Sequence, residues 1–179
     1  MRDIENYKFE KRNTLTLVLF VIYLLALIWI ILFKLQFSIP VMEEGRIINL
    51  IPILGSFDDN GVIRFAEIRV NILAFIPLGI YLCLMNAKRP FVRNVLIIFG
   101  LAVAFEAIQF IFAIGRADTT DVLSNTLGGI IGIGIYALLS KILKGRTNKV
   151  INVLATVFTV LALLLIVMLL VSHRWVIIR

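Results

Sequence analysis

The sequence contains few of the residues on which common catalytic and covalent motifs depend. It has one cysteine and one histidine among 179 residues. One cysteine excludes an intramolecular disulfide and a C-x-x-C metal or redox motif, and one histidine excludes a His-rich, phosphatase-like site. A P-loop, an H-E-x-x-H motif and a nucleophile within G-x-S-x-G are also absent from the sequence. An enzyme built on this chain would therefore have to work with carboxylates and arginine, with or without a metal ion.

Charged residues are scarce too, and the apolar residues occur in long blocks. Only 16% of the chain is charged, whereas 61% is hydrophobic, which predicts an integral membrane protein. The net charge of +7 does not indicate nucleic-acid binding, because the basic residues flank the apolar blocks instead of alternating with aromatic residues. The first apolar block is too long for a signal-peptide core and has no small-residue cleavage site, so we expect it to remain as a helix.

Five apolar segments are long enough to cross a bilayer, for which about 20 residues are needed. The sequence therefore predicts an all-α membrane protein, a single-domain bundle of about five transmembrane helices. The second segment is the shortest and contains Pro77 and Gly79, so we expect a bent helix buried in the bundle. The apolar stretch 47–54, between the first two helices, is too short to cross and should be interfacial or re-entrant. The expected spans are residues 14–33, 70–86, 94–114, 122–143 and 150–172.

The distribution of lysine and arginine predicts the orientation in the membrane. Eleven of the 18 basic residues fall in the N-terminal segment, the second connection and the fourth, whereas seven fall in the first connection, the third and the C-terminal segment. Basic residues are enriched on the cytoplasmic side of membrane proteins. We therefore expect the N-terminus in the cytoplasm and the C-terminus outside, with the long first connection and residues 115–129 together on the outer side.

The stretch GRADTTDVLSNTLGG, residues 115–129, brings polar residues to the start of the fourth segment. At about 100° per residue, Asp121, Asn125, Gly128 and Gly132 share one narrow stripe of that helix. Gly128 and Gly132 have the G-x-x-x-G spacing that lets a second backbone approach closely, so helix packing is the main role expected of them. Asp121 and Asn125 place polar groups further toward the outer end of the stripe.

Asp118 and Asp121 can be interpreted in two ways. D-x-x-D before an apolar run resembles a capping box, and carboxylates suit the positive end of a helix dipole. The same acids are also suited to a polar site, and the two roles are compatible. At the start of the second segment, Glu67, Arg69 and Asn71 leave a similar choice between a solvated helix start and part of a site.

The third segment carries Glu106 and Gln109 one helical turn apart. Counting from the outer end at about 1.5 Å per residue places Glu106 about 13 Å below the surface. An ionised carboxylate near mid-bilayer costs about 2.5–3.5 kcal/mol, so Glu106 should face the bundle interior and be paired or protonated. Arg69 or Arg116 is the expected partner. A purely structural ion pair or hydrogen bond is the alternative to a functional role.

Four blocks of the sequence resemble, in order and approximate spacing, the segments shared by the VanZ-like membrane proteins. The blocks are RIINLIP (46–52), NILAFIPLG (71–79), EAIQF (106–110) and GRADTTDVLSNTLGG (115–129), within a family-like core of about residues 46–134. The resemblance implies a small helical protein of the bacterial cytoplasmic membrane, whose namesake confers low-level resistance to the glycopeptide antibiotic teicoplanin. The matching positions are Arg46, Asn49, Pro52, Asn71, Phe75, Pro77, Gly79, Glu106, Gln109, Arg116, Asp118, Asp121, Asn125, Thr126 and Gly128.

The residues and the resemblance together select ten ligand-binding candidates. No cofactor is expected except a divalent cation, for which Glu106, Asp118 and Asp121 would be the ligands. Some family members have a longer acidic stretch than the D-T-T-D of this chain, which argues against a site of three carboxylates. The candidates are Arg46, Asn49, Arg69, Asn71, Glu106, Gln109, Arg116, Asp118, Asp121 and Asn125.

Three functions remain open at this point. In the first, an outward-facing polar pocket binds or shields an envelope lipid, a cell-wall precursor or the antibiotic, since arginines suit phosphates and carboxylates suit cations. In the second, an intramembrane enzyme modifies a lipid-linked substrate, with Glu106 transferring a proton and Asp118 and Asp121 holding a metal. In the third, Glu106 is the ion site of a small transporter, and a homo-oligomer supplies the symmetry that the sequence lacks.

Overall fold

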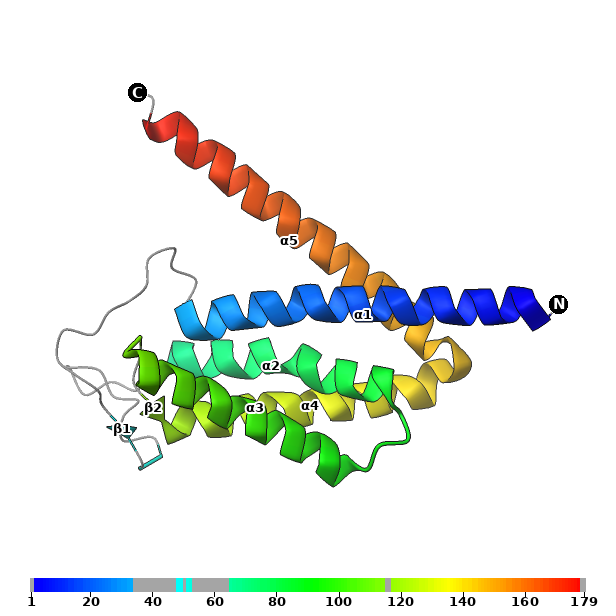
Figure 1. The fold of residues 1–179 in the computed structure, drawn as a ribbon, viewed down its shortest axis with the longest axis horizontal. Helices are drawn as coiled ribbons and strands as arrows, with labels where there is room; N and C mark the ends of the chain where they lie inside the picture. The colour runs from blue at the N-terminus through cyan, green and yellow to red at the C-terminus, as the bar shows by residue number, and fades with distance from the viewer. Residues whose placement is uncertain (1, 34–47, 50, 53–64, 115–116, 178–179) are drawn as a thin grey trace. The chain divides into compact units, whose positions relative to one another are not determined.

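The computed structural model describes all residues except 1, 34–47, 50, 53–64, 115–116 and 178–179. Almost every described residue is helical, which confirms the all-α class (Figure 1). Two very short strands are the exception. The elements are α1 (Arg2–Phe33), β1 (Ile48–Asn49), α2 (Phe65–Met85), α3 (Phe91–Phe112), β2 (Ala117–Asp118), α4 (Thr119–Leu143), the 3-10 turn η2 (Lys144–Arg146) and α5 (Thr147–Ile177).

Four helical stretches among the described residues are long and apolar enough to span a membrane, not five. All five apolar segments of the sequence are helical, but α4, η2 and α5 follow one another without a break. They form one continuous helical stretch of 46 residues, more than twice the length that a single crossing needs. The four stretches are Thr14–Leu32, Phe65–Met85, Phe91–Phe112 and Thr119–Leu164.

The chain divides into two compact units, one made of residues 1–21 with 143–179 and the other of residues 22–142. In the first unit a polar pair links α1 to α5. The Asn152 side chain donates from Nδ2 to Thr16 Oγ1 at 2.8 Å, and Thr16 Oγ1 lies 3.2 Å from Asn152 Oδ1. Both residues are buried, so this reciprocal contact satisfies polar groups in otherwise apolar surroundings.

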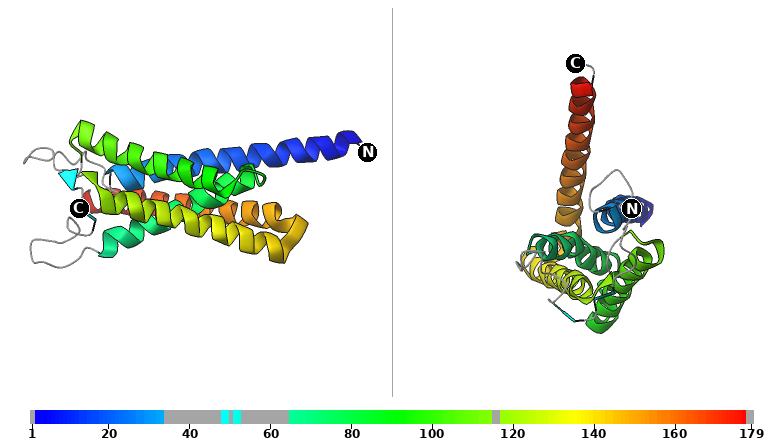
Figure 2. Two further views of the ribbon diagram at one scale, coloured as in Figure 1. Left: turned by 90° about the horizontal axis from the view of Figure 1, so that it is seen from below. Right: turned by 90° about the vertical axis from the view of Figure 1, so that its left-hand side faces the viewer.

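In the second unit, helices α2 and α4 touch through their backbones at glycines. A Cβ atom at Gly132 would collide with the Ile76 carbonyl and lie 3.1 Å from Gly79 Cα. A Cβ atom at Gly79 would in turn collide with the Gly129 carbonyl, and Gly128 faces the Ile72 carbonyl in the same way. This is the close approach that the G-x-x-x-G spacing predicts. Figure 2 shows α2, α3 and α4 side by side from two directions.

Helix α2 is the most buried of the four candidate spans, with 39% of the residues in its apolar stretch of 18 buried, against 28–33% in the corresponding stretches of the others. Phe75 packs edge-on against Phe105 of α3, with ring centroids 6.1 Å apart. Tyr23 of α1 stacks on Tyr81 and donates its hydroxyl to the Ala74 carbonyl at 2.8 Å. The helix continues through Pro77, whose missing N–H removes the usual donor to the Leu73 carbonyl. The Tyr23 hydroxyl bonds to the next carbonyl, that of Ala74.

The end of α3 and the start of α4 are joined by a tight connection. The Ile114 N–H donates to the Gln109 carbonyl and the Ala113 N–H to the Phe110 carbonyl, with Ala113 at a φ of 52°. This is a Schellman-type helix end. Strand β2 follows and pairs in parallel with β1, with Asn49 opposite Asp118. The expected interfacial or re-entrant stretch 47–54 is therefore a strand at residues 48–49, and residues 47, 50, 53 and 54 lie outside the described part of the chain.

Candidate functional site

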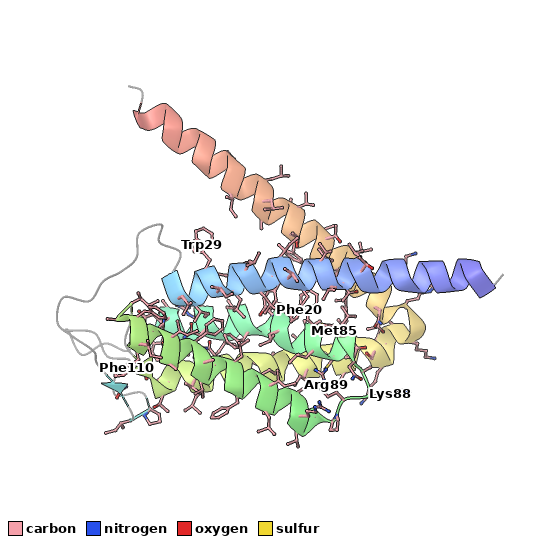
Figure 3. All side chains as sticks on the ribbon, in the orientation of Figure 1. Phe20, Trp29, Met85, Lys88, Arg89 and Phe110 are labelled. Carbon is pink, nitrogen blue, oxygen red and sulfur yellow. The ribbon has the colours of Figure 1, made fainter. Side chains whose placement is uncertain are left out.

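Four helix termini of the second unit lie at one end of it (Figure 1). They are the end of α1, the start of α2, the end of α3 and the start of α4, which is the arrangement expected when successive spans run in opposite directions. Figure 3 labels Phe110 near this end and Lys88 and Arg89 at the opposite one. The polar candidates of α2, α3 and α4 therefore share an end of the bundle, as the predicted topology requires.

Asp118 caps helix α4. Its Oδ1 atom accepts a hydrogen bond from the Thr120 backbone N–H at 2.8 Å, the contact expected of an N-cap side chain. The same oxygen accepts from Asn49 Nδ2 at 3.2 Å. Asp118 is buried, and it links the start of α4 to strand β1. This structural role is sufficient to explain an acid at this position.

The Asp118 backbone N–H bonds to Glu106 and not to Asp121, the acceptor that a capping box would use. In such a box the side chain at the third helical position bonds to the N-cap backbone N–H. Here the Asp118 backbone N–H donates instead to Glu106 Oε2 of α3, at 2.8 Å. Glu106 is only 6% exposed, so this buried acid is stabilised by a backbone amide at the positive end of α4.

Arg69, one of the two expected partners of Glu106, does not pair with it. The Arg69 side chain is exposed and donates from Nε to the Phe65 carbonyl within its own helix, at 3.3 Å. The other expected partner, Arg116, lies outside the described residues, as does the candidate Arg46. Of the two alternatives, the pairing of Arg69 with Glu106 is therefore not formed, because a side chain two residues from Asn71 points to a different face of α2.

Asp121 bonds to α2. The Asn71 side chain donates from Nδ2 to Asp121 Oδ1 at 2.8 Å, across 50 residues of sequence. A hydrogen bond to a charged acceptor is stronger than one between neutral groups. This contact joins α2 and α4 at the same end as Glu106. On α4, Asp121 lies about two turns before Gly128, and on α2, Asn71 directly precedes Ile72, whose carbonyl faces Gly128.

Gln109 connects α3 to the last turn of α1. Its Nε2 atom donates to the Ile31 carbonyl at 2.9 Å. The residue is only 3% exposed, and its Oε1 atom has no hydrogen-bond partner among the described residues. A buried carbonyl oxygen without a donor is uncommon in proteins.

A pocket opens between these side chains, with a cavity volume of about 260 Å³. Of the predicted candidates, Asn71, Glu106, Gln109 and Asp121 line it. Asp118 and Asn49 lie beside it as a bonded pair, and Arg69 is not part of its lining. The complete lining is Ile30, Ile31, Ala66, Glu67, Val70, Asn71, Glu106, Gln109 and Asp121.

Asn125 lies deeper in the bundle and does not line the pocket. It is fully buried, and neither its Oδ1 nor its Nδ2 atom has a partner in the part of the chain that is described. It belongs to the stripe of α4 that also carries Gly128 and Gly132, as its spacing predicts.

The carboxylates of the site do not form a three-ligand metal centre. Within the described ranges, no group of three His, Cys, Asp or Glu side chains is close enough to hold a metal ion. Glu106, Asp118 and Asp121, the proposed cation ligands, are therefore not arranged as such a group. Asp118 is directed to the start of its own helix and to Asn49.

Two kinds of lining group were not among the ten candidates, although the sequence had left Glu67 open between a solvated helix start and part of a site. Glu67 lies one turn before Asn71, and this i, i+4 spacing is a signal that would have placed both on one face. The apolar wall from Ile30, Ile31, Ala66 and Val70 has no such signal, because any apolar residue of these helices is suited equally to lipid contact. The group that accepts the hydrogen bond from Gln109 is the backbone carbonyl of Ile31. The identity of residue 31 gives no indication of this contact, because every residue has a backbone carbonyl.

The comparisons with known proteins agree with this architecture. A family model described as VanZ/LLP1 matches residues 20–143. Protein VanZ of Enterococcus faecium is 40% identical over 125 residues, which cover 69% of this chain and 74% of the relative. No solved structure matches the chain. The family match extends over most of the chain and includes every residue that lines the pocket, and the chain therefore belongs to the VanZ/LLP1 family.

Proposed function

We propose that this VanZ-like protein contributes to glycopeptide resistance of the teicoplanin type in the bacterial cytoplasmic membrane. In this proposal the pocket between α1, α2, α3 and α4 binds or shields an envelope lipid, a cell-wall precursor or the antibiotic. The observation that carries it is the lining itself, in which Glu106, Asp121 and Asn71 from three helices meet at one end of the bundle.

The proposed orientation places this pocket on the outer side. The basic side chains Lys88, Arg89 and Arg93 flank the connection between α2 and α3, at the end opposite Phe110 (Figure 3). Lys141 follows at the end of α4. The acids Glu67, Glu106 and Asp121 lie at the other end, so the charge separation supports basic residues inside and the pocket outside. The N-terminus is then cytoplasmic and the C-terminus external.

An antibiotic-susceptibility test with controlled protein level examines the proposal. Wild-type protein should raise the concentration of teicoplanin needed to inhibit a sensitive host. Asp121→Asn and Glu106→Gln should abolish that gain while membrane abundance remains normal, since each removes a negative charge at the pocket. Leu123→Ala is a matched control, because Leu123 is an exposed residue of the same turn of α4 and lies outside the lining.

Loss of resistance only in variants whose abundance falls would reduce these acids to a structural role. Resistance that survives both substitutions at normal abundance would contradict the proposal. The same strains separate it from the second candidate, an enzyme in which Glu106 transfers a proton to a lipid-linked substrate. An unchanged mass profile of envelope lipids and cell-wall precursors, with and without the protein, would count against turnover.

A further inference from the structure

Asn49, one of the ligand-binding candidates, lies on strand β1 and does not line the pocket. Its side chain donates from Nδ2 to Asp118 Oδ1 at 3.2 Å, and its backbone carbonyl accepts from Thr119 Oγ1 at 3.0 Å. Its own Oδ1 atom accepts from the Ile51 N–H at 3.3 Å, which fixes the orientation of the amide. Asn49 therefore contacts two consecutive residues at the junction of β2 and α4.

Asp118 connects this contact to the pocket. Its Oδ1 atom accepts from Asn49 and also from the Thr120 N–H, at 2.8 Å. Its backbone N–H donates to Glu106 Oε2 at 2.8 Å, and Glu106 lines the pocket. Only the side-chain dihedral angles χ1 and χ2 separate the bonded oxygen of Asp118 from its N–H, and each occupies a restricted set of values. The place of the side chain therefore affects the direction of the N–H.

Burial makes these contacts difficult to replace. Asp118 is 8% exposed and Glu106 is 6% exposed, so water cannot readily take the place of a lost protein partner. An asparagine at position 49 supplies a donor to the Asp118 carboxylate without adding a charge. An aspartate there would set two carboxylates against each other, and an alanine would remove the donor.

We propose that Asn49 is a positioning residue of the pocket, which fixes the carboxylate of Glu106 through Asp118 and does not bind the ligand itself. This inference rests on the proposed function, because it assigns to Asn49 a role at the same pocket. The connection consists of the hydrogen bonds from Asn49 to Asp118 and from Asp118 to Glu106. It couples strand β1, which belongs to the first connection, to helix α3 of the bundle.

Hydrogen–deuterium exchange of the residue 118 amide, measured by NMR on the isotope-labelled full chain in nanodiscs, tests this connection. Glu106→Gln changes the acceptor directly and gives the reference effect. Asn49→Ala should accelerate the exchange about tenfold, with membrane abundance and the exchange of the Gly132 amide unchanged. Ile51→Ala is the matched control, because its side chain is exposed and its backbone N–H still bonds to Asn49. Unaltered exchange at residue 118 in Asn49→Ala, or equal acceleration at Gly132, would overturn the inference.

A swap of the two side chains separates positioning from a general loss of structure. Asn49→Asp alone should accelerate the exchange more than Asn49→Ala, because two carboxylates then face each other. Asn49→Asp combined with Asp118→Asn retains the hydrogen bond with donor and acceptor reversed, and asparagine is as good an N-cap as aspartate. The double variant should return the exchange rate to within about threefold of wild type. It decides the question even if Asn49→Ala fails to fold, and no recovery at normal abundance would overturn the inference.

Teicoplanin susceptibility of the same variants connects the positioning role to the pocket. Asn49→Ala and Asn49→Asp should lose most of the gain in resistance at normal abundance, and the double variant should recover it. Full resistance in Asn49→Ala, in a host where Glu106→Gln abolishes resistance, would overturn the inference. Full resistance in Glu106→Gln would instead refute the proposed function, and the exchange measurements would still decide whether Asn49 positions Glu106.

Discussion

Helices α2 and α4 meet in two different ways along a single contact. At Gly79, Gly128 and Gly132 the two backbones touch, and there is no room for a single added Cβ atom. Toward the start of α4, Asp121 accepts a side-chain hydrogen bond from Asn71, the residue before Ile72 on α2, beside a cavity of about 260 Å³. One pair of helices therefore provides both a closed packing surface and an open polar site.

The difference shows how small residues help to build a site that they do not line. The glycine contact fixes the separation of α2 and α4 at backbone distance. Asn71 Nδ2 and Asp121 Oδ1, from residues 50 positions apart in the sequence, can then meet at 2.8 Å. Larger residues in place of the glycines would force the helices apart and break this bond, so we expect the packing surface and the site to fail together.

The largest expected effect comes from filling the glycine contact. Gly132→Leu would press a side chain into the Ile76 backbone, and we expect it to lower the free energy of unfolding by about 3 kcal/mol or more. The measurement is membrane abundance together with unfolding in mixed micelles. Gly134→Ala is the matched control, because Gly134 has open space around it and alanine favours a helix by about 0.5–1 kcal/mol. Equal tolerance of the two substitutions would contradict the packing account.

A smaller effect is expected from breaking the polar contact at the site. A double-mutant cycle of Asn71→Leu and Asp121→Leu should give a coupling energy of about 1–2 kcal/mol, since the hydrogen bond has a charged acceptor. The Thr16 and Asn152 pair is a neutral counterpart elsewhere in the chain, for which about 0.6 kcal/mol is expected. A coupling no larger than that of the neutral pair would argue against an ionised Asp121.

The smallest effect on stability is expected at Asn125, which belongs to neither part of the contact. Both polar atoms of its fully buried side chain are without a partner in the described structure. Replacing such a group with an apolar one of similar size removes a desolvation penalty, so Asn125→Leu should leave the unfolding midpoint unchanged or raise it. Destabilisation by more than about 2 kcal/mol would indicate that a water molecule or ligand binds to Asn125.

Much of the fold followed from patterns that repeat along the sequence. The apolar segments predicted the helices, and the spacing of Gly128 and Gly132 predicted a close backbone contact, because helical periodicity converts spacing into a shared face. The count of candidate spans was one too high. Lys144, Gly145 and Arg146 interrupt the apolar pattern but continue the chain as a 3-10 turn, so α4 and α5 form one helical stretch.

The site was predicted less completely. Asn71, Glu106, Gln109 and Asp121 were selected because polar residues in apolar helices are costly and therefore conspicuous. Asp118 had two interpretations, and its side-chain bond to Thr120 is that of a helix cap. Arg69 was one of two alternative partners expected for Glu106 from proximity in the predicted topology, but its side chain bonds within α2. The expected position of Arg69 at the outer boundary of the membrane did not determine which face of the helix the arginine would occupy.

The sequence by itself determined that this is a helical membrane protein, which residues are polar within its helices and which glycines permit close packing. These properties depend on composition and on local periodicity, and both are written in the order of residues. Only the tertiary structure decided that the Asp118 backbone N–H donates to Glu106 and that the Ile31 carbonyl orients Gln109. Backbone groups are the same in every residue, so their partners depend on how the helices meet and not on which residues carry them.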